Sequence, residues 1–397
     1  MEDIKITQKN VLVIKELMSC VPNSWDTSPF FLDYVSSNLS KYFSLLKKLD
    51  GYVLSKVLEH QEIAHCLCKG LIDVIASYLR GNIPLAYTRM GEVYSCISEI
   101  LIRKSSRPRA TGLEFGFKAR VILPNDPRPT RNDMFHIPFE LRHIVQNHRY
   151  SIHGIPSIYL GRSIYDCYLE LGKPPLENLW VSLFCFSQDK EDPLSPKHIN
   201  LIDLTIFDDI HNLNVLTYHS FKKEKEYQDA LDSLVDDILL WPLVMACTIA
   251  CRYPDGKFKQ EYIIPQMLYQ LCSDYNEYVG IKYLSTKSPC NAGTPKHVMV
   301  NYALPAQDVK RDGYCPKLKA QLIMTEPITI KEGLDINTSQ SFTTNGLPIL
   351  SYHKDLKEDE TILALDKMTV YFDRLMQSFR KEKKHKLLCP LDNWSKE

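Results

Sequence analysis

Hydrophobic residues recur every three or four positions along the first part of the chain, the spacing of one face of an α-helix. This spacing predicts helices over residues 31–49, 54–80 and 84–103. Gly81 and Asn82 supply a stop signal after the second of these, and Pro84 favours the start of the third. We therefore expect a helical N-terminal domain over residues 1–112 that ends in a polar linker.

From residue 113 the pattern changes to short apolar runs separated by turn residues, which predicts strands. The expected strands cover 117–123, 155–160, 179–186, 199–204, 280–285 and 297–304. Helical spacing returns over 230–240, 265–273 and 361–384. Residues 243–252 are apolar throughout and fit either a strand or a buried helix. The expected fold class is α+β, with a mixed domain over 113–350 and a C-terminal helix and tail over 351–397.

A short helix is expected directly after the strand at 155–160. Ser163 is a suitable N-cap and Asp166, three residues later, is a capping-box partner. Gly172 ends the helix, and Glu170 lies in its last turn. In the strand Tyr159 points away from the face shared by its two apolar neighbours.

Composition narrows the partners and the compartment. The 397 residues carry 48 basic and 48 acidic side chains, so no overall charge attracts nucleic acid or an acidic membrane. The basic run at 380–386 is typical of a solvated helix end, with a nucleic-acid contact as the minor alternative. Twelve cysteines without a C-x-x-C pair predict free structural thiols in a reducing compartment. With no signal peptide and no apolar run of about 20 residues, we expect a cytoplasmic protein.

Three residue types at spacings of ten and eleven carry the candidate chemistry: Arg149, Tyr159 and Glu170. A guanidinium can hold phosphate, an aromatic ring can stack on a base, and a carboxylate can stabilise a sugar cation. Glycine-rich loops of the P-loop and Rossmann types are missing from the sequence, so side chains would have to grip a dinucleotide. Taken singly, an Arg149–Glu170 ion pair and a core Tyr159 are the plainer interpretations.

No metal and no cofactor are expected. His136, His143, His148 and His153 crowd one stretch, but their separations of seven, five and five do not match common zinc-ligand spacing. Glu261 is interpreted as a structural cap of the helix at 265–273 rather than as a second catalytic carboxylate.

The pattern R-Y-S-x-x-G-x-P-x-x-Y-L-G-x-S-x-x-x-x-x-x-E at 149–170 resembles the RES-domain family. W-P-L at 241–243, E-Y-I-I-P-Q at 261–266 and G-I-K-Y-L-S at 280–285 support the resemblance. It implies an ADP-ribosyltransferase-like fold for 113–350, preceded by the helical region of longer stand-alone members. It further implies a bacterial toxin or defence effector that cleaves the nicotinamide–ribose bond of NAD, with water or phosphate as acceptor.

The resemblance also implies residue roles. Arg149 would contact the NAD phosphates, Tyr159 would lie beside the nicotinamide or its ribose, and Glu170 would be the family's glutamate. Ser285 matches the family's serine, and Tyr150 is a further substrate-binding candidate.

The chain departs from the family on its first strand, where an aromatic residue followed by Arg is usual. Here Lys118 follows the aromatic residue and Arg120 lies two positions further on, so either could supply the cation. Lysine cannot make the forked contact of arginine.

Two other functions stay open at this stage. An ADP-ribosyltransferase would use the same cleft with a protein or nucleic acid as acceptor. A non-catalytic interaction protein would keep the cleft only as a relic. The helical region fits a regulatory lid, a homo-oligomerisation module or a docking surface for a neutralising protein partner.

Overall fold

The computed structural model describes residues 6–25, 28–106, 115–186, 200–207, 224–274, 278–287 and 299–338. Towards the C-terminus it describes 361, 364–365, 367–369, 371–372 and 388–390. These residues form mixed helices and strands, in agreement with the expected α+β class. Over the same ranges, no helix combines the length and the apolar character that crossing a bilayer requires.

Five helices form the N-terminal region: α1 (Gln8–Ser19), α2 (Phe31–Leu46), α3 (Gly51–Glu59), α4 (Gln61–Leu79) and α5 (Ile83–Ser105). The helix expected over 54–80 is in fact two helices, because the chain leaves helical geometry at His60. Gly81 has a φ of +79°, the left-handed conformation that ends a helix. The Asn82 side chain then accepts a bond from the Leu85 amide and starts α5.

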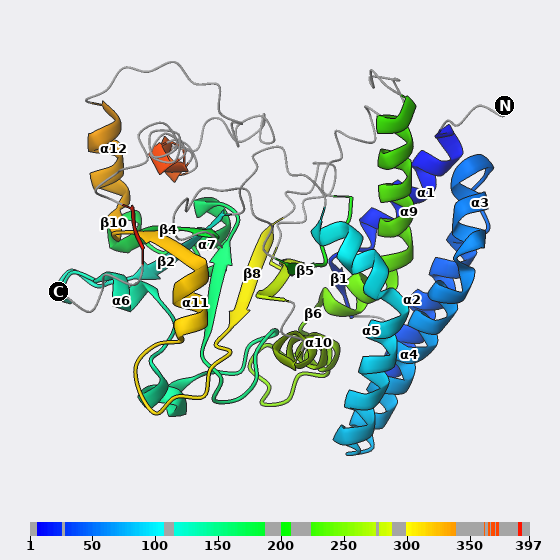
Figure 1. Cartoon of the computed structure of the whole chain (residues 1–397), viewed down its shortest axis with the longest axis horizontal. Coiled ribbons are helices and arrows are strands. Elements are labelled where there is room, and N and C mark those ends of the chain that lie inside the picture. Colours follow the sequence, from blue (N-terminus) through cyan, green and yellow to red (C-terminus); the bar gives the residue numbers. More distant parts are fainter. Residues whose placement is uncertain are drawn as a thin grey trace.

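A nine-stranded mixed sheet forms the second part of the molecule (Figure 1). Its strands are β2 (Phe115–Val121), β3 (Ser157–Gly161), β4 (Leu179–Phe186), β5 (Leu201–Asp203), β7 (Gly280–Leu284), β8 (Val300–Pro305), β9 (Leu322–Thr325), β10 (Ile328–Thr329) and β11 (Leu388–Pro390). Their order is β11-β9-β4-β2-β3-β8-β7-β5, and β10 pairs with β4. The six expected strands all occur, with β4 matching residue for residue. Strands distant in sequence, such as β3 and β8, become neighbours.

Further helices cover the sheet: α6 (Arg131–Met134), α7 (Ile164–Glu170), α9 (Glu224–Cys247), α10 (Ile263–Asp274), α11 (Pro316–Gln321) and α12 (Ile330–Thr338). The first half of the ambiguous stretch at 243–252 is helix, because α9 continues through Pro242 to Cys247. Only β6 (Ile249–Ala250) follows as strand, and it pairs in parallel with β1 (Asn23–Ser24).

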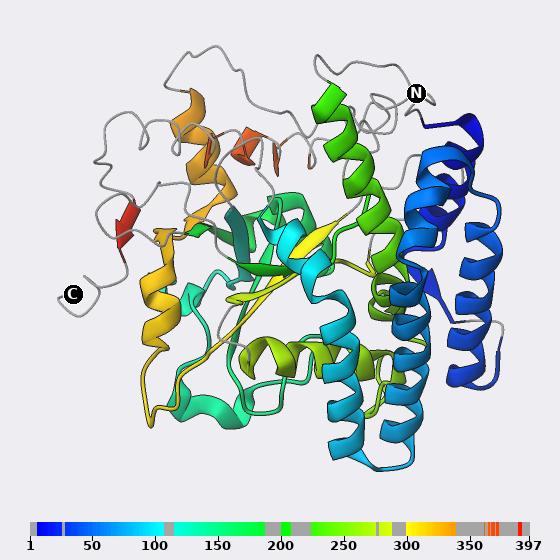
Figure 2. The same cartoon turned by 45° about the vertical axis from the view of Figure 1, so that its right-hand side comes forward.

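The helical N-terminal region shares one hydrophobic core with the part that follows it. The same buried cluster includes residues of α2, α4 and α5 together with α9, α10 and β7. Figures 1 and 2 show α9 lying alongside the N-terminal helices, and α5 contacts the sheet at β5. The Trp241 indole donates to Leu17 O (2.9 Å), and buried Lys104 pairs with Asp237. The sequence boundary near residue 112 is therefore not a boundary of the hydrophobic core.

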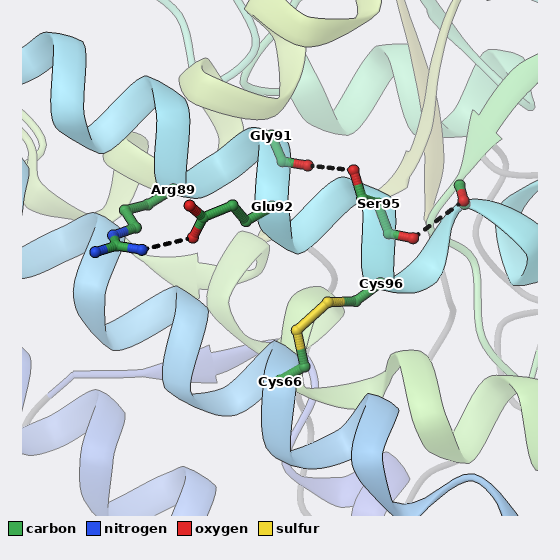
Figure 3. Close-up of a disulfide and its surroundings, with 7 residues drawn as sticks. Cys66, Arg89, Gly91, Glu92, Ser95 and Cys96 are labelled. Carbon is green, nitrogen blue, oxygen red and sulfur yellow. Dashed lines mark hydrogen bonds and ion pairs between the residues drawn. A yellow bond between two sulfur atoms is a disulfide. The ribbon is translucent and has the colours of Figure 1, made fainter.

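A disulfide corrects the expectation that the cysteines are free. Cys66 of α4 is bonded to Cys96 of α5, thirty residues later (Figure 3). Two antiparallel helices bring these cysteines together, which no short sequence spacing could indicate. Of the other described cysteines, eight carry free thiols and six of those are buried.

Much of the C-terminal helix and tail expected over 351–397 lies outside the described residues, as does the basic run at 380–386. Leu365, Met368 and Phe372 are described, and they are buried in one cluster with Phe117 of β2. This part of the chain therefore packs on the sheet.

The Lys104–Asp237 pair provides a test of the shared core. The change Lys104→Met should lower the free energy of unfolding by about 3–5 kcal/mol, because it leaves Asp237 as an uncompensated buried charge. Lys69→Met, which removes an exposed lysine of α4, should change it little. Urea denaturation measures both. A separate early transition of the helical region, with no effect on the rest, would contradict a single core.

Candidate functional site

One row of residues crosses four neighbouring strands and defines one face of the sheet. Phe117 of β2 pairs with Gly161 of β3, Gly161 pairs with Asn301 of β8, and Asn301 pairs with Tyr283 of β7. Directly paired residues of antiparallel strands point to the same face. Tyr159, two residues before Gly161, therefore lies on this face as well.

Helix α7 covers this face because Gly161 lets it approach closely. A Cβ atom at Gly161 would lie 2.8 Å from Cys167 Sγ and 3.2 Å from the Cys167 amide nitrogen. The Ser163 side chain accepts a bond from the Asp166 amide (3.0 Å), as expected for the N-cap. The helix then ends at Glu170, which brings this carboxylate to Asn301 of the row.

The Glu170 carboxylate is held by three side chains from two other strand segments. Oε1 accepts bonds from Ser285 Oγ (2.5 Å) and from Asn301 Nδ2 (2.7 Å). Oε2 faces Lys287 Nζ at 3.3 Å. Ser285 and Asn301 are buried, whereas the Glu170 side chain is 31% exposed and that of Lys287 57% exposed. One carboxylate oxygen is thus anchored in the protein, and the other lies on the side of the exposed lysine.

Ser285 acts on Glu170 in this geometry. It follows β7, and its amide donates to Met299 O (2.9 Å). Its hydroxyl donates to Glu170 and accepts a bond from the Lys287 amide (3.1 Å). The sequence predicts a substrate-binding serine at this position. In the structure its hydroxyl bonds the Glu170 carboxylate and the turn that carries Lys287.

Aromatic residues lie on the same sheet face as Asn301, the residue that bonds the carboxylate. Tyr283 is half-buried, and burial followed by the charge of Glu170 and then Tyr159 raises its pKa well above the usual value. The Tyr159 hydroxyl donates to Tyr150 O (2.7 Å), and its ring lies edge-on to His148 with centroids 5.2 Å apart. Tyr150 itself is fully buried and packs on Tyr283 at 4.2 Å, so it supports the site from within the core rather than facing a ligand.

Arg149 lies elsewhere than expected. Its Nη1 donates to Cys247 O (3.1 Å) and Glu261 O (3.3 Å), and its Nη2 donates to Ile249 O (2.7 Å). The guanidinium is buried and rests 4.9 Å over the Tyr262 ring. These carbonyl contacts make Arg149 a brace between the site and the end of α9. We therefore do not assign it to the phosphates.

Lys118 and Arg120 point to the opposite face of the sheet from Phe117, because neighbouring strand residues alternate. Lys118 Nζ donates to Phe135 O (2.6 Å), and burial followed by the charge of Arg120 lowers its pKa to about 7. Arg120 Nη1 donates to Asp133 O (2.5 Å). The structure does not bring these expected substrate-binding residues to Glu170.

Two residues of the site were not identified from sequence. Asn301 is an ordinary strand residue whose role arises only from the pairing of β8 with β3 and β7. Lys287 lies two residues after Ser285, and this closeness to a predicted site residue is the one sequence feature that could have indicated it. A carboxylate only accepts hydrogen bonds, so both donors suit it.

The other titratable candidates have structural roles. Glu261 is buried and its Oε1 accepts a bond from the Arg252 amide (2.8 Å), so it holds a loop rather than capping α10. His143 and His153 are exposed. Across the described part of the chain, no three His, Cys, Asp or Glu side chains group closely enough to hold a metal ion.

His136 gives a pH-dependent test of this packing. It is buried, its Nε2 accepts a bond from the Cys315 amide (2.8 Å), and burial lowers its pKa from 6.5 to about 4. The unfolded chain binds this proton first, so stability should fall as pH decreases from 6.5 to 4, by up to about 3 kcal/mol. His136→Gln should remove much of this slope in urea denaturation at stepped pH. An unchanged slope would contradict the assignment.

Comparison with known proteins gives one informative similarity. The chain is 29% identical over 307 residues to a Bacillus subtilis (strain 168) protein named "Putative toxin YopC". The match covers 75% of this chain and 65% of that protein, so the chain spans somewhat less than two thirds of its relative. No family model matches, and no solved structure matches.

Proposed function

We propose that this protein cleaves the nicotinamide–ribose bond of NAD, with Glu170 as the catalytic carboxylate. The observation that carries the proposal is that the two oxygens of this carboxylate have different surroundings. Ser285 and Asn301 fix one oxygen, and the other oxygen is directed to the exposed side. A rigidly held single acid is what stabilisation of a sugar cation requires.

The leaving group explains why one acid is enough. The nicotinamide of NAD is cationic before the reaction, so the C1′–N bond breaks with its electron pair going to nitrogen and neutral nicotinamide departs. The ribose develops oxocarbenium character that a nearby carboxylate stabilises. A water oxygen then bonds to C1′ and releases one proton. NAD and water thus give nicotinamide, ADP-ribose and a proton.

The remaining residues have supporting roles in this proposal. Glu170 Oε2 would bond the ribose 2′-hydroxyl and face the developing charge. The rings of Tyr159 and Tyr283 lie on the same sheet face and offer an aromatic surface for the nicotinamide. Ser285 and Asn301 are positioning residues that keep the carboxylate oriented. The proposed fold for the sheet region is ADP-ribosyltransferase-like.

The biological role proposed with this activity is that of a toxin or defence effector that depletes NAD. The similarity to a protein named a putative toxin supports the role at a coarse level. The name of that relative specifies no substrate. We therefore base the proposal of NAD on the chemistry of the site.

The change Glu170→Gln tests the proposal. It keeps an oxygen for Ser285 but removes the charge, and it should lower the rate of nicotinamide release at least about 10²-fold. Mass spectrometry of NAD incubated with each protein measures the substrate, nicotinamide and free ADP-ribose. Labelled ADP-ribose recovered on protein or nucleic acid would instead support a transferase.

The matched control is Glu177→Gln, which neutralises an exposed glutamate seven residues further along the chain. This variant should release nicotinamide at the wild-type rate. Folded wild-type protein that leaves NAD intact would refute the proposal.

A further inference from the structure

The strongest unexplained contact of the site is the one between Lys287 and Glu170. Lys287 Nζ lies 3.3 Å from Glu170 Oε2 and donates to the backbone Glu170 O (2.8 Å). It therefore covers the one carboxylate oxygen that the proposed reaction needs. A fixed ammonium there would repel a developing sugar cation.

The negatively charged pyrophosphate of the proposed substrate also needs a cation at the site. NAD carries a pyrophosphate, and the cations expected to bind it are engaged elsewhere. Arg149 is held by backbone carbonyls, and Lys118 and Arg120 lie on the opposite face of the sheet. Among the described residues Lys287 is the cation in direct contact with Glu170.

Lys287 is suited to a change of partner. Its side chain is 57% exposed, and its ammonium is a point charge on a flexible four-carbon stem. An exposed ion pair of this kind contributes little to stability, so little opposes its exchange. Lys287 follows β7, the strand that carries Tyr283, so the lysine that contacts the carboxylate belongs to the same segment as one ring of the site.

We propose that Lys287 binds a substrate phosphate and, by leaving Glu170 to do so, exposes the carboxylate for reaction. This inference rests on the proposed NAD cleavage and adds a specificity-determining residue to it. The substrate's phosphate then promotes the reaction itself as well as binding. The preferred substrates are nicotinamide nucleotides, and the unphosphorylated nucleoside is a poor substrate.

Three substrates and three variants test this. NAD, nicotinamide mononucleotide and nicotinamide riboside share the scissile bond, but the riboside has no phosphate. The wild type should cleave both nucleotides with kcat/KM values about ten- to a hundredfold above that for the riboside. Lys287→Gln should lose this preference by slowing on the nucleotides while cleaving the riboside at least as well as the wild type. Lys287→Arg should retain most of it.

Lys310→Gln, which neutralises an exposed lysine on the segment after β8, is the control and should behave as wild type. An equal loss on all three substrates in Lys287→Gln would show a merely structural lysine and overturn the inference, as would no change at all. If the wild type releases nicotinamide from none of the three, the proposed function itself fails, and the inference with it.

Discussion

The site depends on one hydrogen-bonded carboxylate, that of Glu170. Neutral donors from two strand segments, Ser285 and Asn301, fix one of its oxygens, and the other faces Lys287. In the proposed reaction Lys287 leaves this second oxygen for a substrate phosphate. The orientation of the acid would then set the geometry that a bound ribose has to meet.

The rest of the fold can be understood as support for that orientation. Gly161 lets α7 pack closely on β3, and the helix delivers Glu170 to the row formed by Asn301 and Tyr283. Arg149 ties the same region to the end of α9 through three backbone carbonyls. Because α9 shares its core with the N-terminal helices, those helices support the sheet as well. A partner that bound the N-terminal helices would therefore contact helices whose buried faces share a hydrophobic core with β7, the strand before Ser285.

Local signals were sufficient for most of the elements and for the position of Glu170 in the last turn of α7. A short apolar run bounded by turn residues located β4, and the Ser163 cap located α7, because each signal depends on residues close in sequence. Contacts between distant segments could not be derived in this way. Spacing could not show that Arg149 faces carbonyls, that Asn301 reaches Glu170, or that Cys66 meets Cys96. Nor could spacing show that Lys118 and Arg120 lie on the face of the sheet opposite Phe117 and bond the carbonyls of Phe135 and Asp133.

The most direct test of the central claim is a crystal structure of the Glu170→Gln protein with NAD bound. The account predicts that the 2′-hydroxyl of the nicotinamide ribose lies within hydrogen-bonding distance of residue 170, with the ring beside Tyr159 and Tyr283. NAD bound on the face that carries Lys118, or bound with its nicotinamide ribose far from residue 170, would contradict it.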